Sequence, residues 1–262
     1  MNAFRGRVVA RLPREAFRPS AIFLATLALC LVSGWMAWAG FGIARFNVFL
    51  FVISGWIVSL CLHEYAHALV AYRGGDVAVA ERGYLTLNPL KYTHPLLSIV
   101  LPVIFIILGG IGLPGGAVWV DRHALRGGKV VDSLVSLAGP AVNVLFTVAL
   151  VLPFWFISDT RAHHEFWVGL AFLAFLQLTA SLLNLMPIPG VDGGNTLYPW
   201  LSPKWQRGFD LMAPYGLLLL FLLLWHPTVG GLFFSAVFAL GDLIGLPREL
   251  YAQGFALIRF WS

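Results

Sequence analysis

Long apolar runs separated by short polar loops restrict the fold of this chain more than any other feature of its sequence. An α-helix needs about 20 predominantly apolar residues to cross the hydrocarbon core of a bilayer. Only 11% of the residues are charged, against about 25% in soluble domains, so a soluble core could not absorb this much apolar surface. We therefore expect an all-α polytopic membrane protein with about six transmembrane helices, near residues 20–43, 47–72, 131–157, 165–187, 209–226 and 229–247.

A single integral-membrane domain is expected to fill residues 1–262, because no segment is long and polar enough to form a separate soluble module. Its core would cover about 47–195, with a basic tail at 1–19 and an amphipathic tail at 248–262. The apolar run after the basic tail is longer than the core of a signal peptide, which has about 7–15 residues, so we expect an uncleaved first span. Both cysteines lie in apolar runs, which argues against a disulfide framework.

Basic residues predict the orientation of the helices, because Lys and Arg concentrate in cytoplasmic loops. The net charge of +5 is therefore a topology signal, and we expect no nucleic-acid partner. Both termini are predicted to lie on the cytoplasmic side of a bacterial-type inner membrane. The loops 73–93 and 119–130 also carry basic residues, which conflicts with a full crossing by the apolar segment 94–113. That segment is predicted to be re-entrant, with a full span as the alternative.

Ionisable residues are unexpected in the second apolar run, yet it contains His63-Glu64-Tyr65-Ala66-His67, which follows the pattern H-E-x-x-H. Residues four apart lie on one face of a helix, so His63 and His67 can bind the same metal ion. Glu64 is rotated by about 100° and can instead reach a water on the metal. Each ionisable group at the centre of a bilayer costs about 2.5–3.5 kcal/mol, so three together indicate a function. The alternative is a buried polar network that neighbouring helices satisfy.

A catalytic zinc site needs a third protein ligand and an open position for water. The segment NLMPIPGVDGGN, at the end of the fourth candidate span, supplies Asp192, and the order of the spans brings it to the same side of the membrane as His67. Pro187, Pro189 and Gly190 break the helix before it, and a broken helix at membrane depth is tolerated where it lines a watery cavity. Alternatively, Asp192 is an N-cap in an interfacial turn.

Three motifs occur in the order HEYAH, SLAGPAVN and NLMPIPGVDGG, and together they resemble the site-2 protease family of intramembrane zinc metalloproteases. The late motif of that family runs N-x-x-P-x-P-x-x-D-G, and this chain matches it at Asn184, Pro187, Pro189, Asp192 and Gly193. The resemblance covers the core of the chain, whereas the first span and the last two are less diagnostic.

The resemblance implies roles for individual residues. One Zn²⁺ ion per chain would be held by His63, His67 and Asp192, and zinc-activated water would attack the peptide bond with Glu64 as general base. Asn143, in the SLAGPAVN segment, would take part in the reaction or, alternatively, only pack one helix against another. The complete set of implied substrate-binding residues is Asn184, Pro187, Pro189 and Asn143.

Two connecting segments, LNPLKYTHP and LPGGAVWVD, resemble those of compact bacterial members of the family. The second predicts a small β-hairpin near the active site, whose exposed edge would pair with an unwound substrate. Some members carry PDZ or CBS modules, but no segment of this chain is long or polar enough to form either.

These observations predict an intramembrane zinc metalloprotease that cleaves within or near transmembrane segments of membrane proteins, with its active site near the cytoplasmic side. The expected partners are a transmembrane protein substrate, the lipid bilayer and a membrane regulator protein. The alternative is a membrane metal transporter or metal sensor that uses the same two histidines and Asp192, but this alternative assigns no function to Glu64.

Overall fold

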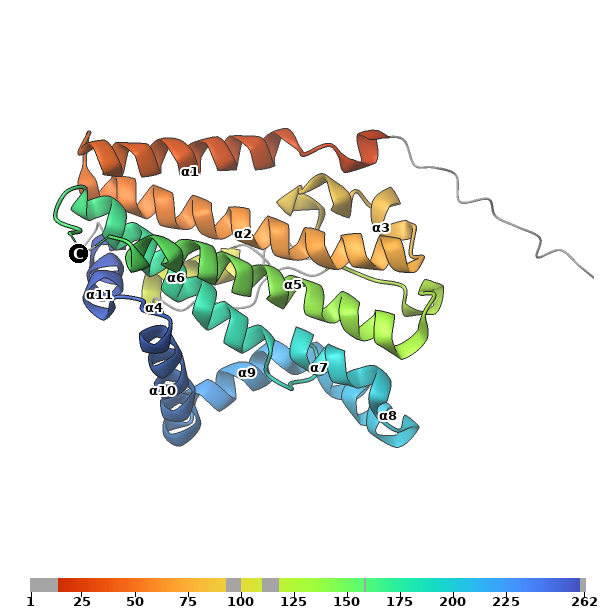
Figure 1. The fold of residues 1–262 in the computed structure, drawn as a ribbon. Coiled ribbons are helices and arrows are strands. Elements are labelled where there is room, and N and C mark those ends of the chain that lie inside the picture. The colour runs from red at the N-terminus through yellow and green to blue at the C-terminus, as the bar shows by residue number, and fades with distance from the viewer. Residues whose placement is uncertain (1–13, 93–99, 110–117, 158, 260–262) are drawn as a thin grey trace, which may run out of the picture.

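The computed structural model of this chain describes residues 14–92, 100–109, 118–157 and 159–259. Four long helices lie side by side: α1 (Ala21–Ala39), α2 (Ala44–Gly74), α5 (Gly128–Val151) and α6 (His164–Asn184) (Figure 1). The shorter helices are α3 (Ala78–Glu81), α4 (Leu101–Gly109), α7 (Asp192–Leu197), α8 (Pro203–Met212), α9 (Gly216–Trp225), α10 (Pro227–Leu243) and α11 (Arg248–Ile258). Short 3₁₀ turns lie at Arg14–Phe17, Tyr84–Thr86, Pro89–Lys91, Arg122–Ala124, Leu152–Trp155, Tyr198–Trp200 and Ala213–Tyr215.

Five helical segments of the described chain are long and apolar enough to cross a membrane, which confirms an all-α polytopic membrane protein. The predicted count of about six is not supported, because α10, at the place of the sixth, has only 17 residues. It ends early because Gly245 has a left-handed φ of +79° and Pro247 follows it, and neither continues a helix. The five segments are Ala21–Ala39, Ala44–Gly74, Gly128–Trp155, His164–Asn184 and Pro203–Trp225.

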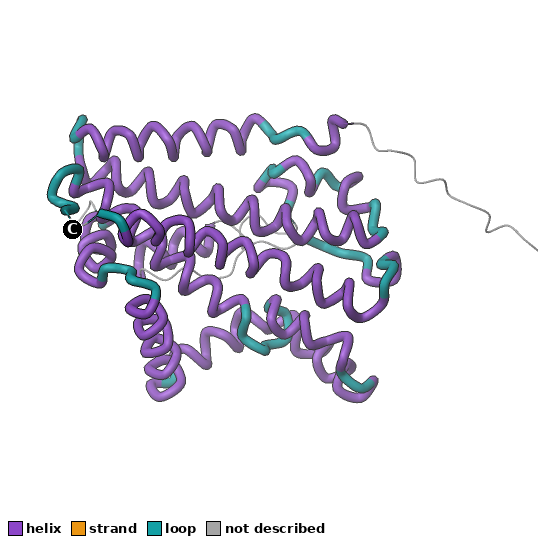
Figure 2. The backbone as a smooth tube through the Cα atoms, viewed as in Figure 1, coloured by secondary structure: helices purple, strands orange, loops and turns teal. Residues whose placement is uncertain are grey.

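The predicted β-hairpin is not supported, because the described residues contain no strand (Figure 2). Of the segment LPGGAVWVD, only 118–121 is described, and it is irregular. Side chains that follow α2 and α3 bind its backbone in place of a partner strand. The Asp121 N–H donates to Asp76 Oδ2 at 2.8 Å, and the Trp119 carbonyl accepts a hydrogen bond from the Arg82 guanidinium at 3.1 Å.

Within the segment 94–113, which is predicted to be re-entrant, the structure describes residues 100–109, and nine of them form helix α4. Its 9 residues extend about 14 Å, less than half of a hydrocarbon core that is roughly 30 Å thick. Residues 94–99 and 110–113 lie outside the described part of the chain, so re-entry stays a prediction.

Helix α6 forms the centre of the bundle. Buried residues make up 89% of its apolar window, compared with 67% for α2 and 22% for α1, so α1 mainly faces lipid. Helices α2 and α6 pack closely at Gly55, where an added Cβ would lie 2.7 Å from Leu173 Cδ2. This contact holds the helix that carries both histidines of the HEYAH motif against the most buried part of the protein.

Helices α8, α9 and α10 diverge from the four long helices (Figure 1). Only 17% of the apolar window of Pro203–Trp225 is buried, and large apolar side chains such as Leu218, Leu222 and Leu232 are exposed. These helices therefore present an apolar surface suited to lipid. Helix α7, which precedes them, remains packed against α5.

Replacing Asp76 with Ala is expected to lower the free energy of unfolding by about 1–3 kcal/mol, because it leaves two backbone N–H groups without their acceptor. Asp76 is 1% exposed, and its carboxylate accepts hydrogen bonds from the N–H groups of Ala78 and Asp121. Thermal unfolding in detergent micelles measures the change. Asp159→Ala is the matched control, because Asp159 is exposed and, within the described part of the chain, accepts a hydrogen bond from the nearby N–H of Arg161. Equal stability of the two variants would contradict the prediction.

Candidate metal centre

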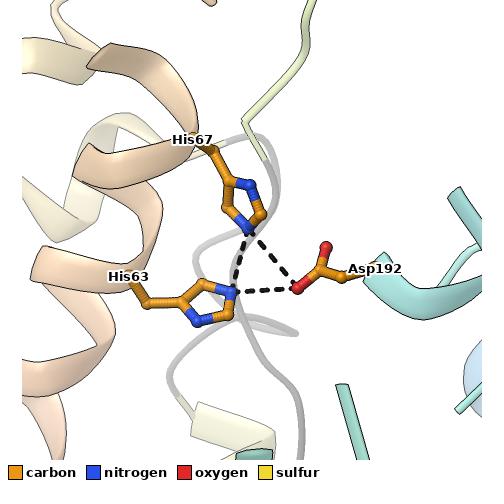
Figure 3. A group of neighbouring side chains, drawn as sticks. All are labelled: His63, His67 and Asp192. Carbon is orange, nitrogen blue, oxygen red and sulfur yellow. Dashed lines mark hydrogen bonds and ion pairs between the residues drawn. The ribbon is translucent and has the colours of Figure 1, made fainter. Parts of the chain in front are cut away.

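Helix α2 carries two of the three side chains that converge on one point. It runs for 31 residues without a proline and ends at Gly74, where the following Gly75 has a left-handed φ of +119°. His63 and His67 lie one turn apart on it and are only 5% and 7% exposed. As their four-residue spacing predicts, the rings project from the same face of the helix, and their Nε2 atoms are 3.0 Å apart (Figure 3).

Asp192 reaches the same point from a distant part of the sequence (Figure 3). A proline-rich turn after α6 leads into α7, of which Asp192 is the first residue. The turn closes tightly because Gly193 has no side chain: a Cβ there would lie 2.3 Å from the Leu185 carbonyl oxygen. The N-cap position of α7 belongs to Val191, so the carboxylate of Asp192 faces the imidazoles and is not the cap of this helix.

The spacing of the three donor atoms fits a zinc ion. The Oδ2 atom of Asp192 lies 3.2 Å from His63 Nε2 and 3.4 Å from His67 Nε2. A tetrahedral zinc ion with bonds of about 2.0–2.1 Å keeps its ligand atoms about 3.3 Å apart. Two imidazole nitrogens and a carboxylate oxygen are also donors that catalytic zinc sites use. These three residues therefore form a candidate metal centre among the described residues.

The hydrogen bond from His67 to α5 selects the ring form that a metal needs. Its Nδ1 lies 2.6 Å from the carbonyl oxygen of Val135. A carbonyl only accepts, so Nδ1 carries the proton and Nε2 keeps its lone pair for a cation. The bond also fixes the orientation of the ring.

The charge of Asp192 suits a cation as well. Burial opposes ionisation of this carboxyl, but the imidazoles of His67 and His63 outweigh burial and hold its pKa well below the usual range. An ionised Asp192 carboxylate completes, with the two imidazole nitrogens, a donor set that zinc accepts.

Glu64 lies beside the three converging side chains without joining them. It is 2% exposed, and its Oε1 is 3.9 Å from His63 Nε2. Within the described part of the chain, its Oε2 has no hydrogen-bond partner. A buried carboxylate oxygen in this position is able to accept a proton from a molecule bound next to the metal centre.

Gly139 of the SLAGPAVN segment lies directly against both imidazoles. A Cβ at this position would lie 2.2 Å from His67 Nε2 and 2.5 Å from His63 Nε2. Sequence analysis assigns the segment only to helix packing or to Asn143, and so it misses this contact. The available signal is a glycine followed by a proline in the middle of an apolar helix, where neither residue favours the helix.

The other predicted site residues lie on α5, at the end of α6 and in the turn between α6 and α7. Asn184 is the last residue of α6 and is 5% exposed, and Pro187 and Pro189 lie in the turn that leads to α7. Pro187 is exposed, whereas Pro189 is partly covered and its carbonyl oxygen would lie 2.1 Å from a Cβ on Gly216. Asn143 is buried one turn beyond Gly139 on α5. Their contact with substrate stays a prediction.

Tyr92 is a further buried residue near the motif that sequence analysis does not assign. It is 2% exposed, and its hydroxyl donates to the Cys61 carbonyl of α2 at 3.1 Å. Burial raises the pKa of the Tyr92 phenol, and the nearby Cys61 and Glu64 add to the effect. The phenol is therefore a neutral donor that ties the connecting segment to the turn of α2 before the two histidines.

Curated relatives of this chain carry the names of metalloproteases. A Mycobacterium tuberculosis (strain ATCC 25618 / H37Rv) protein named "Putative zinc metalloprotease Rip2" is 49% identical over 253 residues, which cover 95% of this chain and 96% of the relative. The Mycolicibacterium smegmatis protein of the same name is 47% identical over 256 residues, with 95% and 96% covered. "Putative zinc metalloprotease YwhC" of Bacillus subtilis is 31% identical over 180 residues, 66% of this chain and 79% of that protein. No family model and no solved structure matches the chain.

Proposed function

Because the chain belongs to the site-2 protease family of zinc metalloproteases, we propose that it is an intramembrane protease that cleaves within or near transmembrane segments of other membrane proteins. One observation carries the proposal: His63, His67 and Asp192 converge in a bundle of apolar helices, with the carboxylate of Glu64 beside them. This combination supplies a metal site and a separate base in one place.

Metal binding and proton transfer are assigned to different residues in this proposal. When bound, zinc would act as a Lewis acid on the scissile carbonyl and lower the pKa of water toward about 7. Glu64, whose carboxylate lies 3.9 Å from His63 Nε2, takes a proton from the attacking water and then delivers it to the leaving amine. His67, held by Val135 in one ring form, and ionised Asp192 keep their donor atoms directed toward the shared point.

The substrate in this proposal is a transmembrane helix of another protein. A helix engages its carbonyls in its own hydrogen bonds, so the segment has to unwind locally before attack. Asn184 stands at the entrance of the turn that leads to Asp192 and is proposed to bind the extended form, together with Pro187, Pro189 and Asn143. Selection of the substrate is proposed to rest on the membrane helices, their loops or a regulator protein.

The proposed orientation follows from the basic residues. The centre lies near the end of α2 that leads to Arg73 and to the basic loops, which favour the cytoplasm. We therefore place both termini and the active site on the cytoplasmic side of a bacterial-type inner membrane. One zinc ion is proposed for each chain, in a single membrane domain.

Purified protein in proteoliposomes with a candidate membrane substrate tests this function. We expect bound zinc and cleavage products whose new ends, identified by mass spectrometry, fall within or near a transmembrane segment. A chelator should stop cleavage, and added zinc should restore it. Zinc flux across the liposomes without cleavage would instead support a transporter, and zinc binding with neither flux nor cleavage would support a sensor.

A further inference from the structure

Helix α7, which carries Asp192, is too short to hold its own position. It has 6 residues, and its N-cap residue Val191 makes no side-chain hydrogen bond to it. Isolated helices shorter than about 12–15 residues are marginal even in favourable sequences. Contacts from outside α7 must therefore hold Asp192 close to His63 and His67.

Ser133 of α5 makes such contacts. Its Oγ–H donates to the Thr196 carbonyl at 2.7 Å, and its Oγ accepts the indole N–H of Trp200 at 2.9 Å. Thr196 lies one turn after Asp192, and its hydroxyl donates to the Asp192 carbonyl at 2.8 Å. Ser133 is only 8% exposed, so water competes little for these bonds. A short path of hydrogen bonds thus joins α5 to the residue that carries the carboxylate.

The same part of α5 also holds His67. The Val135 carbonyl, two residues after Ser133, accepts the His67 Nδ1–H, and Gly139 lies one turn later against both imidazoles. Helix α5 therefore contacts α2 and α7 at once. Its first turns set the distance between the donor atoms that the two helices contribute.

We propose that Ser133 is a positioning residue of the metal centre, which holds α7 so that Asp192 meets the two imidazoles. The proposal rests on the proposed function, because it assumes that these residues bind zinc. Neighbouring contacts are more exposed: the ammonium of Lys129 lies 5.7 Å from the centre of the Trp200 ring, and Trp200 is 57% exposed. The buried hydroxyl of Ser133 thus joins α5 to residues 196–200 through two hydrogen bonds.

Comparison of Ser133→Ala with Ser136→Ala tests the proposal. Ser136 is 6% exposed on the same helix, but among the described residues its hydroxyl donates to the Asp132 carbonyl within α5, at 3.4 Å, and to no residue of α7. Affinity for Zn²⁺ alone is measured on the purified full-length protein in micelles by competition with a chromophoric chelator. We expect Ser133→Ala to bind Zn²⁺ about 10-fold more weakly than wild type, as loss of an outer contact to a metal ligand typically does, and Ser136→Ala to bind like wild type.

Two further measurements separate positioning from general loss of structure. The d–d absorption of bound Co²⁺, which reports ligand geometry, should change in Ser133→Ala and return in Ser133→Thr, which keeps a hydroxyl. If Ser133→Ala does not fold, Trp200→Phe tests the positioning role instead. This variant removes one of the two hydrogen bonds of Ser133 by changing an exposed residue, and it should also weaken Zn²⁺ binding.

Equal Zn²⁺ affinity of Ser133→Ala, Ser136→Ala and wild type would overturn the positioning role while leaving the protease proposal intact. If Ser133→Ala does not fold, unchanged affinity of Trp200→Phe would overturn it in the same way. Failure of the wild-type protein to bind Zn²⁺ at all would instead remove the proposed function, and the role of Ser133 with it.

Discussion

Glu64→Gln is expected to slow substrate cleavage by about 10²–10⁴-fold while zinc binding stays unchanged. Gln has nearly the same size as Glu but cannot take the proton of an attacking water. Glu64 is outside the group of three donor residues, and its Oε1 lies 3.9 Å from His63 Nε2, so its replacement by a neutral amide leaves that group in place. Single-turnover cleavage of a transmembrane substrate, with metal analysis of the same preparation, measures both effects.

Glu81→Gln is the matched control, because Glu81 is an exposed glutamate at the end of α3. Its cleavage rate should equal that of wild type. A Glu64→Gln protein that cleaves at the wild-type rate would show that another group is the base. Loss of zinc together with activity would show that Glu64 holds the metal centre together, contrary to the separate role proposed for it.

Gly139→Ala is expected to weaken zinc binding by at least about 100-fold, more than the usual effect of altering a residue behind a single ligand. The added methyl carbon would lie 2.2 Å from His67 Nε2 and 2.5 Å from His63 Nε2, so both imidazoles would have to move. Helix α5 cannot retreat freely, because Val135 and Ser133 bond it to α2 and α7. Chelator competition measures the affinity, and cleavage should fall with it.

Gly231→Ala provides the comparison for this substitution. Gly231 lies within helix α10, and an added Cβ there has no neighbour within 4 Å. Ala also favours a helix more than Gly does, so this variant should fold and bind zinc like wild type. Normal zinc affinity in Gly139→Ala would mean that α2 and α5 separate easily at this point, and the role of Gly139 would have to be abandoned.

Two segments were predicted wrongly, one because of partners distant in sequence and one because of local residues that end a helix. An edge strand was a plausible interpretation of LPGGAVWVD, but the described residues 118–121 bond to Asp76 and Arg82 and form no strand. The predicted span at 229–247 contains enough apolar residues, yet Gly245 and Pro247 end α10 at Leu243. Hydropathy counts residues and does not show where the backbone stops being helical.

Features that repeat over one or two helical turns could be inferred from the chain alone. The apolar runs indicate membrane helices, and the four-residue spacing of His63 and His67 places both rings on one face, because helical periodicity is a local property. The pairing of these rings with Asp192 was inferred from the order of the spans and from the resemblance of the three motifs to the site-2 protease family. A glycine before a proline in α5 marks the position of Gly139, but its contact with both rings depends on how α5 is rotated between two other helices. The hydrogen bonds of Ser133 to residues 196–200 depend on the same rotation. That rotation brings together residues distant in sequence, such as His67 and Val135, which are 68 residues apart and whose ring and backbone carbonyl form a hydrogen bond.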